Sequence, residues 1–490
     1  MSEASGQNWQ APGSAEGQVL LFIGGNWRKG TSAKRLPVVN PATETVIGHV
    51  ACATQEDLDD ALAAAEKAWG QWRGISAYER SKIMRRAASL VRDRADTIGA
   101  TMTAEQGKPL AESKGEAFAA ADVIEWFAEE GRRAYGRIVP SRDTSVRQLV
   151  VKQPIGPVAA FTPWNFPLNQ MVRKVSAALA AGCSIIVKPS EETPASAAHL
   201  AQAFADAGLP PGVLNLVFGD PEQISSYLIP HKVIRKVSFT GSTDVGKRLA
   251  GLAGSHMKKA TMELGGHAPV VVAADADMQR AVKFLLAAKF RNAGQVCTSP
   301  TRLLLHADIH DEFLKHLVAG IQGIRIGDGF DPETRMGPLA NGRRITAMER
   351  LVDDAVGRGG KILTGGQRLA RPGYFYPPTV LADVPVTADI MNTEPFGPIL
   401  VAIRFSKLED ALAECNRLAF GLASYAFTES ARTAQILGDG IEAGMTGINH
   451  SGLALPELPF GGIRDSGYGS EGGLEALEDH LVSKLISHAT

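Results

Sequence analysis

The spacing of apolar residues divides the chain into a helical first third and a longer part in which strands alternate with helices. In the first third, apolar residues recur at the spacing of one helix face at Leu58, Leu62, Ala65, Trp69 and Trp72. Thr54 and Asp57 precede this run with the spacing of a helix-capping box, and Ser76 and Glu79 repeat that spacing before a second helix. This region is therefore predicted to contain capped amphipathic helices.

From Gln153 onward the pattern changes to short apolar runs separated by loops and helices. Strands are predicted at Val158–Phe161, Ile185–Lys188, Val213–Val217 and Lys236–Phe239, with one helix ending at Ala177–Ala181 and another over Ala195–Ala207. A second alternating stretch runs from Pro269 to about Ala426. Strands that alternate with helices of this length are typical of parallel sheets, so two α/β domains are predicted.

Two segments have no obvious place in these sheets. Ile138–Lys152 is polar and rich in strand-forming residues, and Leu481–His488 reads as one more short strand. Both are expected to project as an interface. Residues 1–17 are rich in Ser, Gly, Gln and Ala and are expected to form a flexible arm before folding begins near Leu20.

Composition is that of a globular protein and excludes several classes of partner. The 490 residues are too many for one compact core, and 44% hydrophobic with 21% charged residues is ordinary. The formal net charge is −1 with no basic block, which argues against nucleic acid as a partner. The longest apolar runs are strand-sized, so no membrane partner is expected, and the N-terminus shows no signal peptide.

The cysteines and histidines argue against structural metal and disulfides. The cysteines, Cys52, Cys183, Cys297 and Cys415, are too scattered for a disulfide framework or a zinc site. This distribution fits the reducing cytoplasm, which is the expected location. His306 and His310 lack a third ligand nearby in sequence and are expected to be surface residues, so no metal is expected.

Three residues are candidates for covalent chemistry. Cys297 follows Asn-Ala-Gly-Gln-Val; a lone cysteine is usually inert, but a glycine-containing turn with polar neighbours can present a nucleophile. Glu263, in Met-Glu-Leu-Gly-Gly-His, is either a solvated side chain or a general base whose glycines allow close backbone approach. Asn165, in the rigid loop 161–168, either forms an Asx turn or presents its amide to an oxyanion.

A fourth segment, Phe239–Gly246, reads as a strand, a Gly/Ser turn and the start of a helix. Free N–H groups and the helix dipole at such a turn favour a phosphate group. The segment is not a G-x-G-x-x-G motif, so its spacing alone is a weak signal.

In this order, the motifs resemble the aldehyde dehydrogenase superfamily over nearly the whole chain, and most of all its succinate-semialdehyde dehydrogenase group. The matching blocks are FTPWNFPL, KPSEETP, FTGSTDVGK, MELGGHAP, NAGQVCTS, EPFGPIL and PFGGIRDSGYGSEGG. The resemblance implies an α/β fold with a Rossmann-like cofactor domain, an α/β catalytic domain and a small β oligomerisation flap. The implied bounds are 18–136 and 153–262 for the NAD-binding domain, 263–455 for the catalytic domain, and 137–152 with 465–490 for the oligomerisation segments.

The resemblance also implies a mechanism and its residues. Cys297 attacks the aldehyde, and Asn165 with the Cys297 N–H holds the oxyanion. Hydride transfer to the nicotinamide leaves a thioester, which water activated by Glu263 hydrolyses. Lys174 supports proton movement. The residues implied to bind the cofactor are Thr162, Pro163, Trp164, Lys188, Glu191, Gly241, Ser242, Glu394 and Phe396.

NAD is expected in preference to NADP, because Glu191 would repel a 2′-phosphate on the adenine ribose. Arg173 and Arg291 match positions that bind the substrate carboxylate in the succinate-semialdehyde group, where a planar guanidinium suits a carboxylate. That group's pocket serine is missing from Gly452–Pro456. An ω-carboxylated semialdehyde such as succinate semialdehyde is therefore predicted, with glutarate semialdehyde, 2-oxoglutarate semialdehyde and uncharged aldehydes as alternatives.

Further expectations concern the oligomeric state, a departure from the family's sequence pattern, and the rival activities. The flap implies a homodimer or a homotetramer. His267 stands where the family usually has Lys or Asn. A CoA-acylating enzyme would lack Glu263, and a non-catalytic relative would have lost Cys297, Glu263 or Asn165, so both rivals are disfavoured.

Overall fold

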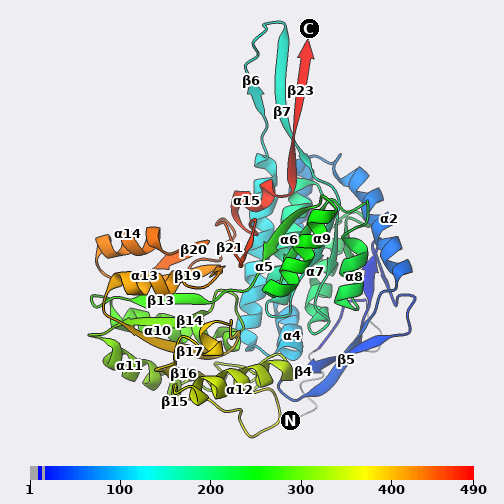
Figure 1. The fold of residues 1–490 in the computed structure, drawn as a ribbon. Coiled ribbons are helices and arrows are strands. Elements are labelled where there is room, and N and C mark those ends of the chain that lie inside the picture. The colour runs from blue at the N-terminus through cyan, green and yellow to red at the C-terminus, as the bar shows by residue number, and fades with distance from the viewer. Residues whose placement is uncertain (1–8, 14–16, 490) are drawn as a thin grey trace.

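The computed structural model describes residues 9–13 and 17–489, and these form two α/β halves and a projecting flap. In Figure 1 the half with α6–α9 lies to the right and the half with α10–α14 to the lower left. The long helix α5 (Leu110–Glu130) runs through the middle of the body (Figure 1). The predicted α/β class with two sheets is therefore confirmed.

The first sheet has the strand order β22-β12-β11-β8-β9-β10-β2-β3. In that order the strands are Gly467–Tyr468, Lys259–Glu263, Lys236–Thr240, Val158–Phe161, Ile185–Lys188, Leu214–Leu216, Leu21–Ile23 and Asn26–Arg28. The strands from β12 to β10 are parallel, and their residues are almost all buried. Helices on both faces of the sheet bury nearly every residue of these strands. The strands are therefore short runs of apolar residues, which is why the sequence predicts them.

Helices cover both faces of this sheet. α2 (Gln55–Trp72), α6 (Pro167–Ala181), α7 (Pro194–Asp206) and α9 (Thr243–Ser255) contact the sheet, and α8 (Pro221–Leu228) packs beside α2. A further layer, α3 (Ala77–Asp93), α4 (Ala95–Gln106), α5 and η1 (Gly131–Arg133), packs on α6 and α7. The capping box that opens α2 is confirmed: Asp57 N–H donates to Thr54 Oγ1, and Thr54 N–H donates to Asp57 Oδ2. Trp69 lies at the edge of the buried face, whereas Trp72 is fully buried and donates to Leu179 O at 3.1 Å.

The second sheet has the order β15-β16-β17-β14-β13-β19-β20, parallel except for β15. In that order the strands are Lys361–Thr364, Thr379–Ala382, Ile399–Phe405, Pro300–His306, Ala268–Val272, Ala423–Phe427 and Met445–Ile448. Its helices are α10 (Met278–Phe290), η2 (Arg291–Gly294), α11 (His310–Gln322), α12 (Gly342–Gly357), η3 (Asp389–Met391), α13 (Leu408–Asn416) and α14 (Ala431–Gly440). The alternation therefore extends past Ala426 to β20. Two small sheets, β1-β5-β4 (Gln18–Val19, Thr45–Ala51, Arg35–Asn40) and β18-β21 (Phe420–Gly421, Ile463–Arg464), complete the body.

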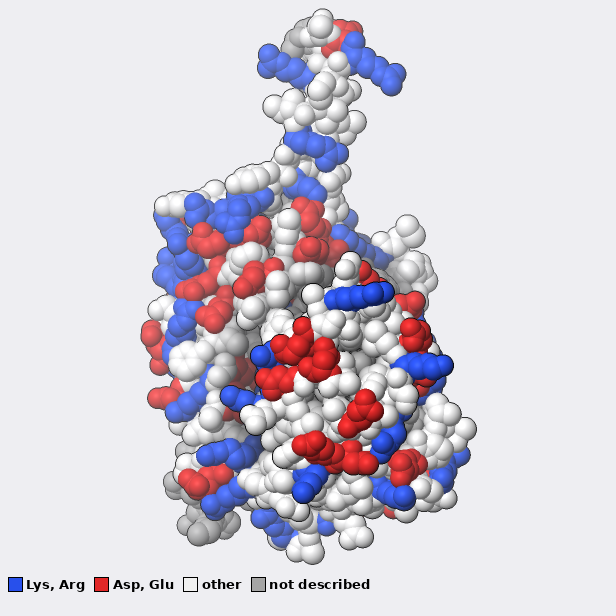
Figure 2. All heavy atoms as spheres, turned by 90° about the vertical axis from the view of Figure 1, so that its left-hand side faces the viewer, with Lys and Arg blue, Asp and Glu red and all other residues white. Residues whose placement is uncertain are grey.

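The flap consists of β6 (Arg137–Val139), β7 (Val146–Pro154) and β23 (Leu481–Ala489). β7 and β23 pair antiparallel along their whole length, and they project from the body together (Figure 1). Figure 2 shows both charge signs interspersed over the visible body. The flap instead carries mostly cations, namely Arg137, Arg142, Arg147, Lys152 and Lys484 against Asp143.

The range 465–490 divides between the flap and the body. β22 joins the first sheet beside β12, and α15 (Gly473–Glu478) packs on α5 and α6. Among the described residues of 465–490, β23 is therefore the part that belongs to the flap.

The expected N-terminal arm lies partly outside the described residues, at positions 1–8 and 14–16. Trp9, however, is buried and donates to Glu105 Oε2 at 3.0 Å. The expectation of a loose arm is thus wrong for this residue, whose large apolar ring packs on the body. Within residues 9–13 and 17–489, no helix is both long and apolar enough to cross a membrane.

The capping box gives a direct test of the fold. Thr54→Ala removes the hydroxyl that accepts from Asp57 N–H and should lower the free energy of unfolding by about 1 kcal/mol in urea denaturation. Thr346→Ala, on the exposed face of α12, is the matched control and should be neutral within about 0.5 kcal/mol. Equal effects of the two substitutions would contradict a capping role for Thr54.

Candidate active site

A hollow of about 440 Å³ lies at the carboxyl ends of β8, β9 and β11. In parallel α/β sheets this edge is the ordinary ligand site. The hollow is lined by seven of the predicted cofactor residues, namely Thr162, Pro163, Trp164, Lys188, Glu191, Gly241 and Ser242. The structure therefore brings together loops that were separate in the sequence.

Glu191 is held in place at one end of this hollow. Lys188 Nζ lies 2.6 Å from Glu191 Oε1, and Gly219 N–H donates to the same oxygen at 3.0 Å. Lys188 also donates to Pro189 O at 3.0 Å. The carboxylate is thus fixed by a cation and a backbone donor, and it cannot leave the hollow without losing both bonds.

The turn at Gly241 leads into the N-terminus of α9, where no side chain caps the helix. A Cβ at Gly241 would lie 2.4 Å from the Phe239 ring, so a larger residue here would displace that ring. Free N–H groups at the start of a 13-residue helix can bind a phosphate oxygen. These features fit the pyrophosphate of a dinucleotide.

Two glycines bring the loops of both sheets into contact at the other end. A Cβ at Gly265 would lie 2.6 Å from Glu394 Oε2, and one at Gly266 would lie 2.9 Å from Cys297 O. Gly266 N–H donates to Glu394 Oε1 at 3.2 Å. The predicted close approach after Glu263 is confirmed, since larger residues would displace Glu394 and Cys297.

Glu394 and Phe396 lie in one loop at this junction. Burial raises the pKa of Glu394 to about 7, opposed by the Gly266 hydrogen bond and by Arg344 and Lys289. Phe396 packs edge-on against Trp164, with ring centroids 5.6 Å apart. Its φ of +44° is unusual for a side chain of this size and is held by the surrounding packing. The two residues thus present a carboxylate and an aromatic ring beside the hollow.

Cys297 is half-buried at the end of η2 and its following turn. Burial raises the pKa of its thiol above the usual range, and the nearby negative charges of Glu263 and Glu394 act in the same direction. The Thr298 N–H and Arg173 oppose the shift. The side chain therefore rests as a thiol that needs a nearby base to become nucleophilic.

Glu263 ends β12 and is almost fully buried. Neither of its carboxyl oxygens has a hydrogen-bond partner within the part of the chain that the structure describes. Burial raises its pKa well above the usual range, Glu471 adds to the shift, and Lys174 and Arg173 oppose it. An unpartnered buried carboxyl beside a thiol is poised to exchange protons.

Lys174 lies beside this pair on α6 and is fully buried. Its ammonium forms an ion pair with Glu471 and donates to Thr240 Oγ1 at 2.7 Å. Glu471 also accepts from Ser238 Oγ at 3.3 Å. The lysine thus balances a second buried carboxylate next to Glu263.

Asn165 is buried in the loop between β8 and α6. Its Nδ2 donates to Gln295 O, two residues before Cys297, at 3.2 Å. Its Oδ1 has no partner among the described residues. The amide therefore faces the cysteine loop, and the Asx turn that was the alternative interpretation is not what its side chain forms.

Arg173 and Arg291 lie against different aromatic rings. Arg173 is buried, donates to Ala454 O at 2.6 Å and to Glu471 O at 3.2 Å, and lies 4.8 Å from the Phe460 ring centroid. Arg291 is exposed, 4.9 Å from the Phe166 centroid, and lines a cavity of about 820 Å³ between α10 and α11. Arg291 is thus the more accessible of the two guanidinium groups.

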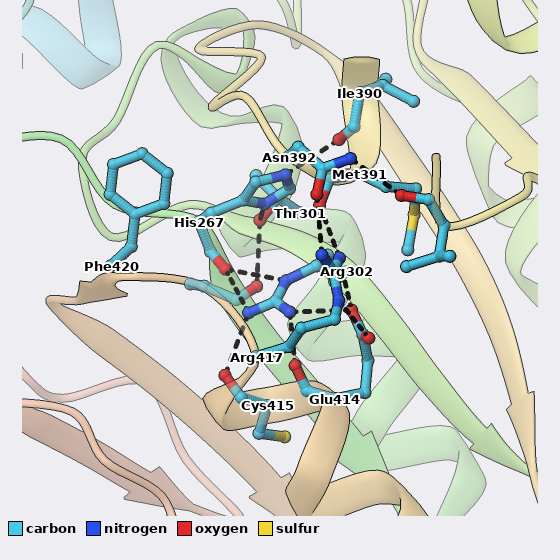
Figure 3. Close-up of polar contacts among 12 residues, drawn as sticks. His267, Thr301, Arg302, Ile390, Met391, Asn392, Glu414, Cys415, Arg417 and Phe420 are labelled. Carbon is cyan, nitrogen blue, oxygen red and sulfur yellow. Dashed lines mark hydrogen bonds and ion pairs between the residues drawn. The ribbon is translucent and has the colours of Figure 1, made fainter. Parts of the chain in front are cut away.

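His267 lies in a buried polar network, which Figure 3 shows. Its Nε2 lies 2.9 Å from Ile390 O and its Nδ1 lies 2.7 Å from Thr301 Oγ1. Burial and Arg302 lower its pKa well below the usual range, so the ring is neutral. Nε2–H then donates to Ile390 and the threonine hydroxyl donates to Nδ1. The imidazole therefore ties the segment after Glu263 to η3, just before Glu394.

Several residues at the site were not found from the sequence. Glu471 lies within the quoted GSEGG block, which was the available signal. Gln295 lies within the quoted cysteine motif but contributes through its backbone oxygen. Lys289, on α10, is buried 3.3 Å from Ser299 Oγ, and burial lowers its pKa to about 7. Sequence alone gave no reason to expect a buried lysine there, since lysines are usually exposed.

Comparisons with known proteins identify the family to which the chain is similar. Residues 27–486 match the aldehyde dehydrogenase family. The chain is 45% identical over 468 residues to a 4-(hydroxymethyl)benzenesulfonate dehydrogenase of Comamonas testosteroni, covering 96% of this chain and 98% of that protein. It is 40% identical over 465 residues to the NADP(+) succinate-semialdehyde dehydrogenase of Escherichia coli (strain K12), covering 95% and 96%.

A solved structure gives the same result for the fold. The crystal structure of succinate-semialdehyde dehydrogenase from Burkholderia pseudomallei superposes with a TM-score of 0.94 at 40% identity, covering 96% of this chain and 98% of that one. The chain belongs to the aldehyde dehydrogenase family and is an oxidoreductase for NAD(P)-dependent aldehyde oxidation.

Proposed function

We propose that the protein oxidises an aldehyde that carries a distant anionic group to the carboxylic acid, through a thioester on Cys297 that water hydrolyses. The observation that carries this proposal is the meeting of Cys297, Glu263 and Asn165 beside the hollow. Asn165 follows Trp164 of the lining and donates to the cysteine loop, and the Glu263 backbone oxygen accepts from Gly241 N–H of the lining. Together they supply a nucleophile, a base and an amide donor.

In the acylation half-reaction, the Cys297 sulfur forms a bond to the aldehyde carbon. Glu263, which is buried without a hydrogen-bond partner among the described residues and whose pKa burial raises, is the group that takes the thiol proton. The carbonyl oxygen becomes an oxyanion, which Asn165 Nδ2 and the Cys297 N–H stabilise by donating hydrogen bonds. Asn165 Nδ2 is already aimed at the cysteine loop, so little reorganisation is needed.

The cofactor residues fit a nicotinamide dinucleotide. Glu191 can accept from the adenine ribose, the uncapped start of α9 can hold the pyrophosphate, and Glu394 can accept from the nicotinamide ribose. Phe396 and Trp164 form an aromatic wall for the nicotinamide ring. When bound, the oxidised nicotinamide supplies the hydride acceptor that converts the thiohemiacetal to a thioester.

Before deacylation, Glu263 releases the thiol proton to solvent and is again a carboxylate. It then takes a proton from water as the water oxygen bonds to the acyl carbon. The carbon–sulfur bond breaks, the Cys297 sulfur leaves as the thiolate, and the carboxylic acid is released. Lys174 and Glu471 hold compensating charge beside Glu263 and support proton movement. A CoA-acylating enzyme has no need of this base, so the buried, unpartnered Glu263 favours water as the acyl acceptor.

Replacing the base should separate the two half-reactions. In Glu263→Gln the first NADH should form more slowly than in the wild type, because solvent must then take the thiol proton, but deacylation should slow more. Steady-state turnover should fall by roughly 10²-fold or more and acyl-enzyme should accumulate. Because burial raises its pKa, the carboxylate form of Glu263 grows at higher pH than that of an ordinary carboxyl, so the wild-type deacylation rate should increase with pH over that higher range. Rapid mixing with intact mass measurement tests both statements.

The matched control is Cys297→Ala, which should form no acyl-enzyme while binding NAD as the wild type does. Cys415→Ala, at a buried cysteine on α13, should leave turnover within about twofold. Normal turnover in Glu263→Gln would remove this residue from the mechanism.

We also propose that NAD is preferred over NADP. Glu191 is fixed in the hollow by Gly219 and Lys188, so a 2′-phosphate would meet a carboxylate that cannot move aside freely. Repulsion between unit charges near 4 Å is on the order of 4 kcal/mol at an effective dielectric of 20, and Lys188 offsets part of it. Because the Escherichia coli relative is named for NADP(+), the proposed preference for NAD would distinguish this chain from that relative.

Glu191→Gln keeps the shape of the side chain and removes its charge. We expect the ratio of kcat/KM for NAD to kcat/KM for NADP to exceed one in the wild type and to fall at least about tenfold in the variant, equivalent to about 1.4 kcal/mol. Glu192→Gln, at the neighbouring carboxylate that pairs with Arg343, is the control and should change the ratio less. A wild-type ratio at or below one would contradict the preference.

The proposed substrate has an anionic group away from the aldehyde. Support comes from Arg173 and Arg291, and from two relatives whose names include succinate semialdehyde and a benzenesulfonate, both anions. The segment Gly452–Pro456 lacks the pocket serine, and its Ala454 backbone oxygen accepts from Arg173 at 2.6 Å, so longer or aromatic anionic aldehydes join succinate semialdehyde as candidates.

Steady-state kinetics with pairs of charged and uncharged aldehydes test whether the site binds an anionic group. Succinate semialdehyde should exceed butanal, and 4-carboxybenzaldehyde should exceed benzaldehyde, in kcat/KM. Arg291→Ala should reduce that advantage about 10- to 100-fold, the range for hydrogen bonds to a charged group of about 1.5–3 kcal/mol. Arg280→Ala, exposed on α10, is the control. An unchanged ratio in Arg291→Ala would mean that the pocket is a general aldehyde site.

We further propose that the flap pairs with a second copy of the chain as a homodimer or homotetramer. Ile138, Val482 and Leu485 are 78%, 41% and 62% exposed, although they are apolar residues in paired strands. Such a sheet is costly to leave in water. Light scattering should give a mass of at least two chains, and Leu485→Glu with Ile138→Glu should lower it; a monomeric wild type would contradict the proposal.

A further inference from the structure

Gln106, the last residue of α4, and Lys108, in the turn before α5, take no part in the proposed mechanism. Lys108 is 1% exposed, and its Nζ lies 2.6 Å from Glu116 Oε2. The same Nζ donates to the backbone oxygen of Asn165 at 2.8 Å and lies 4.0 Å from the Phe166 ring centroid. A buried ammonium is costly unless its donors are satisfied, and here they are satisfied at the proposed oxyanion loop.

The partner of Lys108 fixes the other end of that loop. Glu116 Oε1 accepts from the N–H groups of Leu168 and Asn169 in the first turn of α6, at 2.9 and 3.0 Å. α6 has no capping side chain of its own, so this carboxylate from α5 satisfies its free donors. The Lys108–Glu116 pair therefore holds the loop from Asn165 to Asn169 at both ends.

The nucleophile loop meets the same carbonyl. Asn292 Nδ2 donates to the Asn165 backbone oxygen at 2.8 Å, and Gln106 Nε2 donates to Asn292 Oδ1 at 2.8 Å. Gln106 Oε1 in turn accepts from Lys108 N–H at 3.0 Å. The Asn165 carbonyl is thus the point where the loop that carries the amide donor and the loop that carries Cys297 are held together.

We propose that Lys108, with Glu116, is a positioning group for the oxyanion site, acting through the Asn165 carbonyl to aim the Asn165 amide at the carbon attacked by Cys297. This inference rests on the proposed function, because it assumes that Asn165 stabilises an oxyanion. It adds a positioning role for residues on α5 and at its N-terminal end. A donor displaced by about 1 Å from its productive place costs up to about 10²-fold in rate.

The test variant is Lys108→Met with Glu116→Gln. It removes both charges together, and glutamine can still accept from Leu168 and Asn169, so α6 keeps its cap. The matched control is Lys114→Met, the same substitution at an exposed α5 lysine that pairs with Asp96. The first-turnover rate of NADH formation should fall roughly 10- to 100-fold in the double variant and stay within about twofold in the control.

Two further readouts separate positioning from general disorder. Alkylation of Cys297 by iodoacetamide forms no oxyanion, so its rate and the Kd for NAD should stay within about twofold. In an Asn165→Ala background, the Lys108/Glu116 substitutions should add less than about a twofold loss, because their effect passes through Asn165. First-turnover loss that is equal with and without Asn165, or matched by alkylation and NAD binding, would overturn the positioning role.

The same measurements distinguish failure of this inference from failure of the proposed function. If Asn165→Ala alone keeps the wild-type first-turnover rate, the proposed oxyanion role is wrong and the positioning role falls with it. If Asn165→Ala is slow and the Lys108/Glu116 variant is as fast as the wild type, the positioning role alone is wrong.

Discussion

The close approach of backbone at Gly265 and Gly266 is the constraint on which the site depends. These glycines follow Glu263 at the end of the first sheet, and their missing side chains leave room for Glu394 and for the Cys297 carbonyl from the second half of the chain. At Gly294 the cysteine loop meets Gly397 O, 2.2 Å from where a Cβ would lie, so the same rule holds on the opposite side. Base, nucleophile and cofactor-binding loop can meet only because these positions carry no side chain.

Buried charges dominate the chemistry of this junction. Glu263 is left without a hydrogen-bond partner among the described residues, while nearby Glu471 is paired with Lys174. Burial is the main cause of the raised pKa of Glu263, and the negative charge of Glu471 adds to it, while Lys174 and Arg173 oppose it. The same logic applies at Lys108, where an ion pair is used to hold backbone oxygens and N–H groups in place. Stability and reactivity are therefore set by the same polar groups.

Sequence patterns predicted the local structure well and the long-range contacts poorly. Val158–Phe161 and Ile185–Lys188 form the predicted strands because buried parallel strands are short runs of apolar residues. The pairing of β7 with β23, more than 300 residues apart, is set by tertiary contacts that no local pattern carries. The sequence also did not predict the burial of Lys108, Glu116 and Trp9. Lysine and glutamate are usually exposed, and Trp9 lies in a segment whose composition is typical of a flexible arm. The sequence predicted a close backbone approach at the glycines after Glu263, but it did not show which atoms would lie against them.

The central claim is that the substrate carbon becomes bound to Cys297 sulfur. It is tested most directly by acid-quenching the wild-type enzyme within one turnover of aldehyde and NAD, digesting it, and locating the acyl mass by peptide mapping. One acyl group is expected on the peptide that contains Cys297, and hydroxylamine should remove it, as it does from a thioester. An acyl group on the peptide of Cys52, Cys183 or Cys415, or product formation with no acyl peptide during a turnover slow enough to sample, would contradict it.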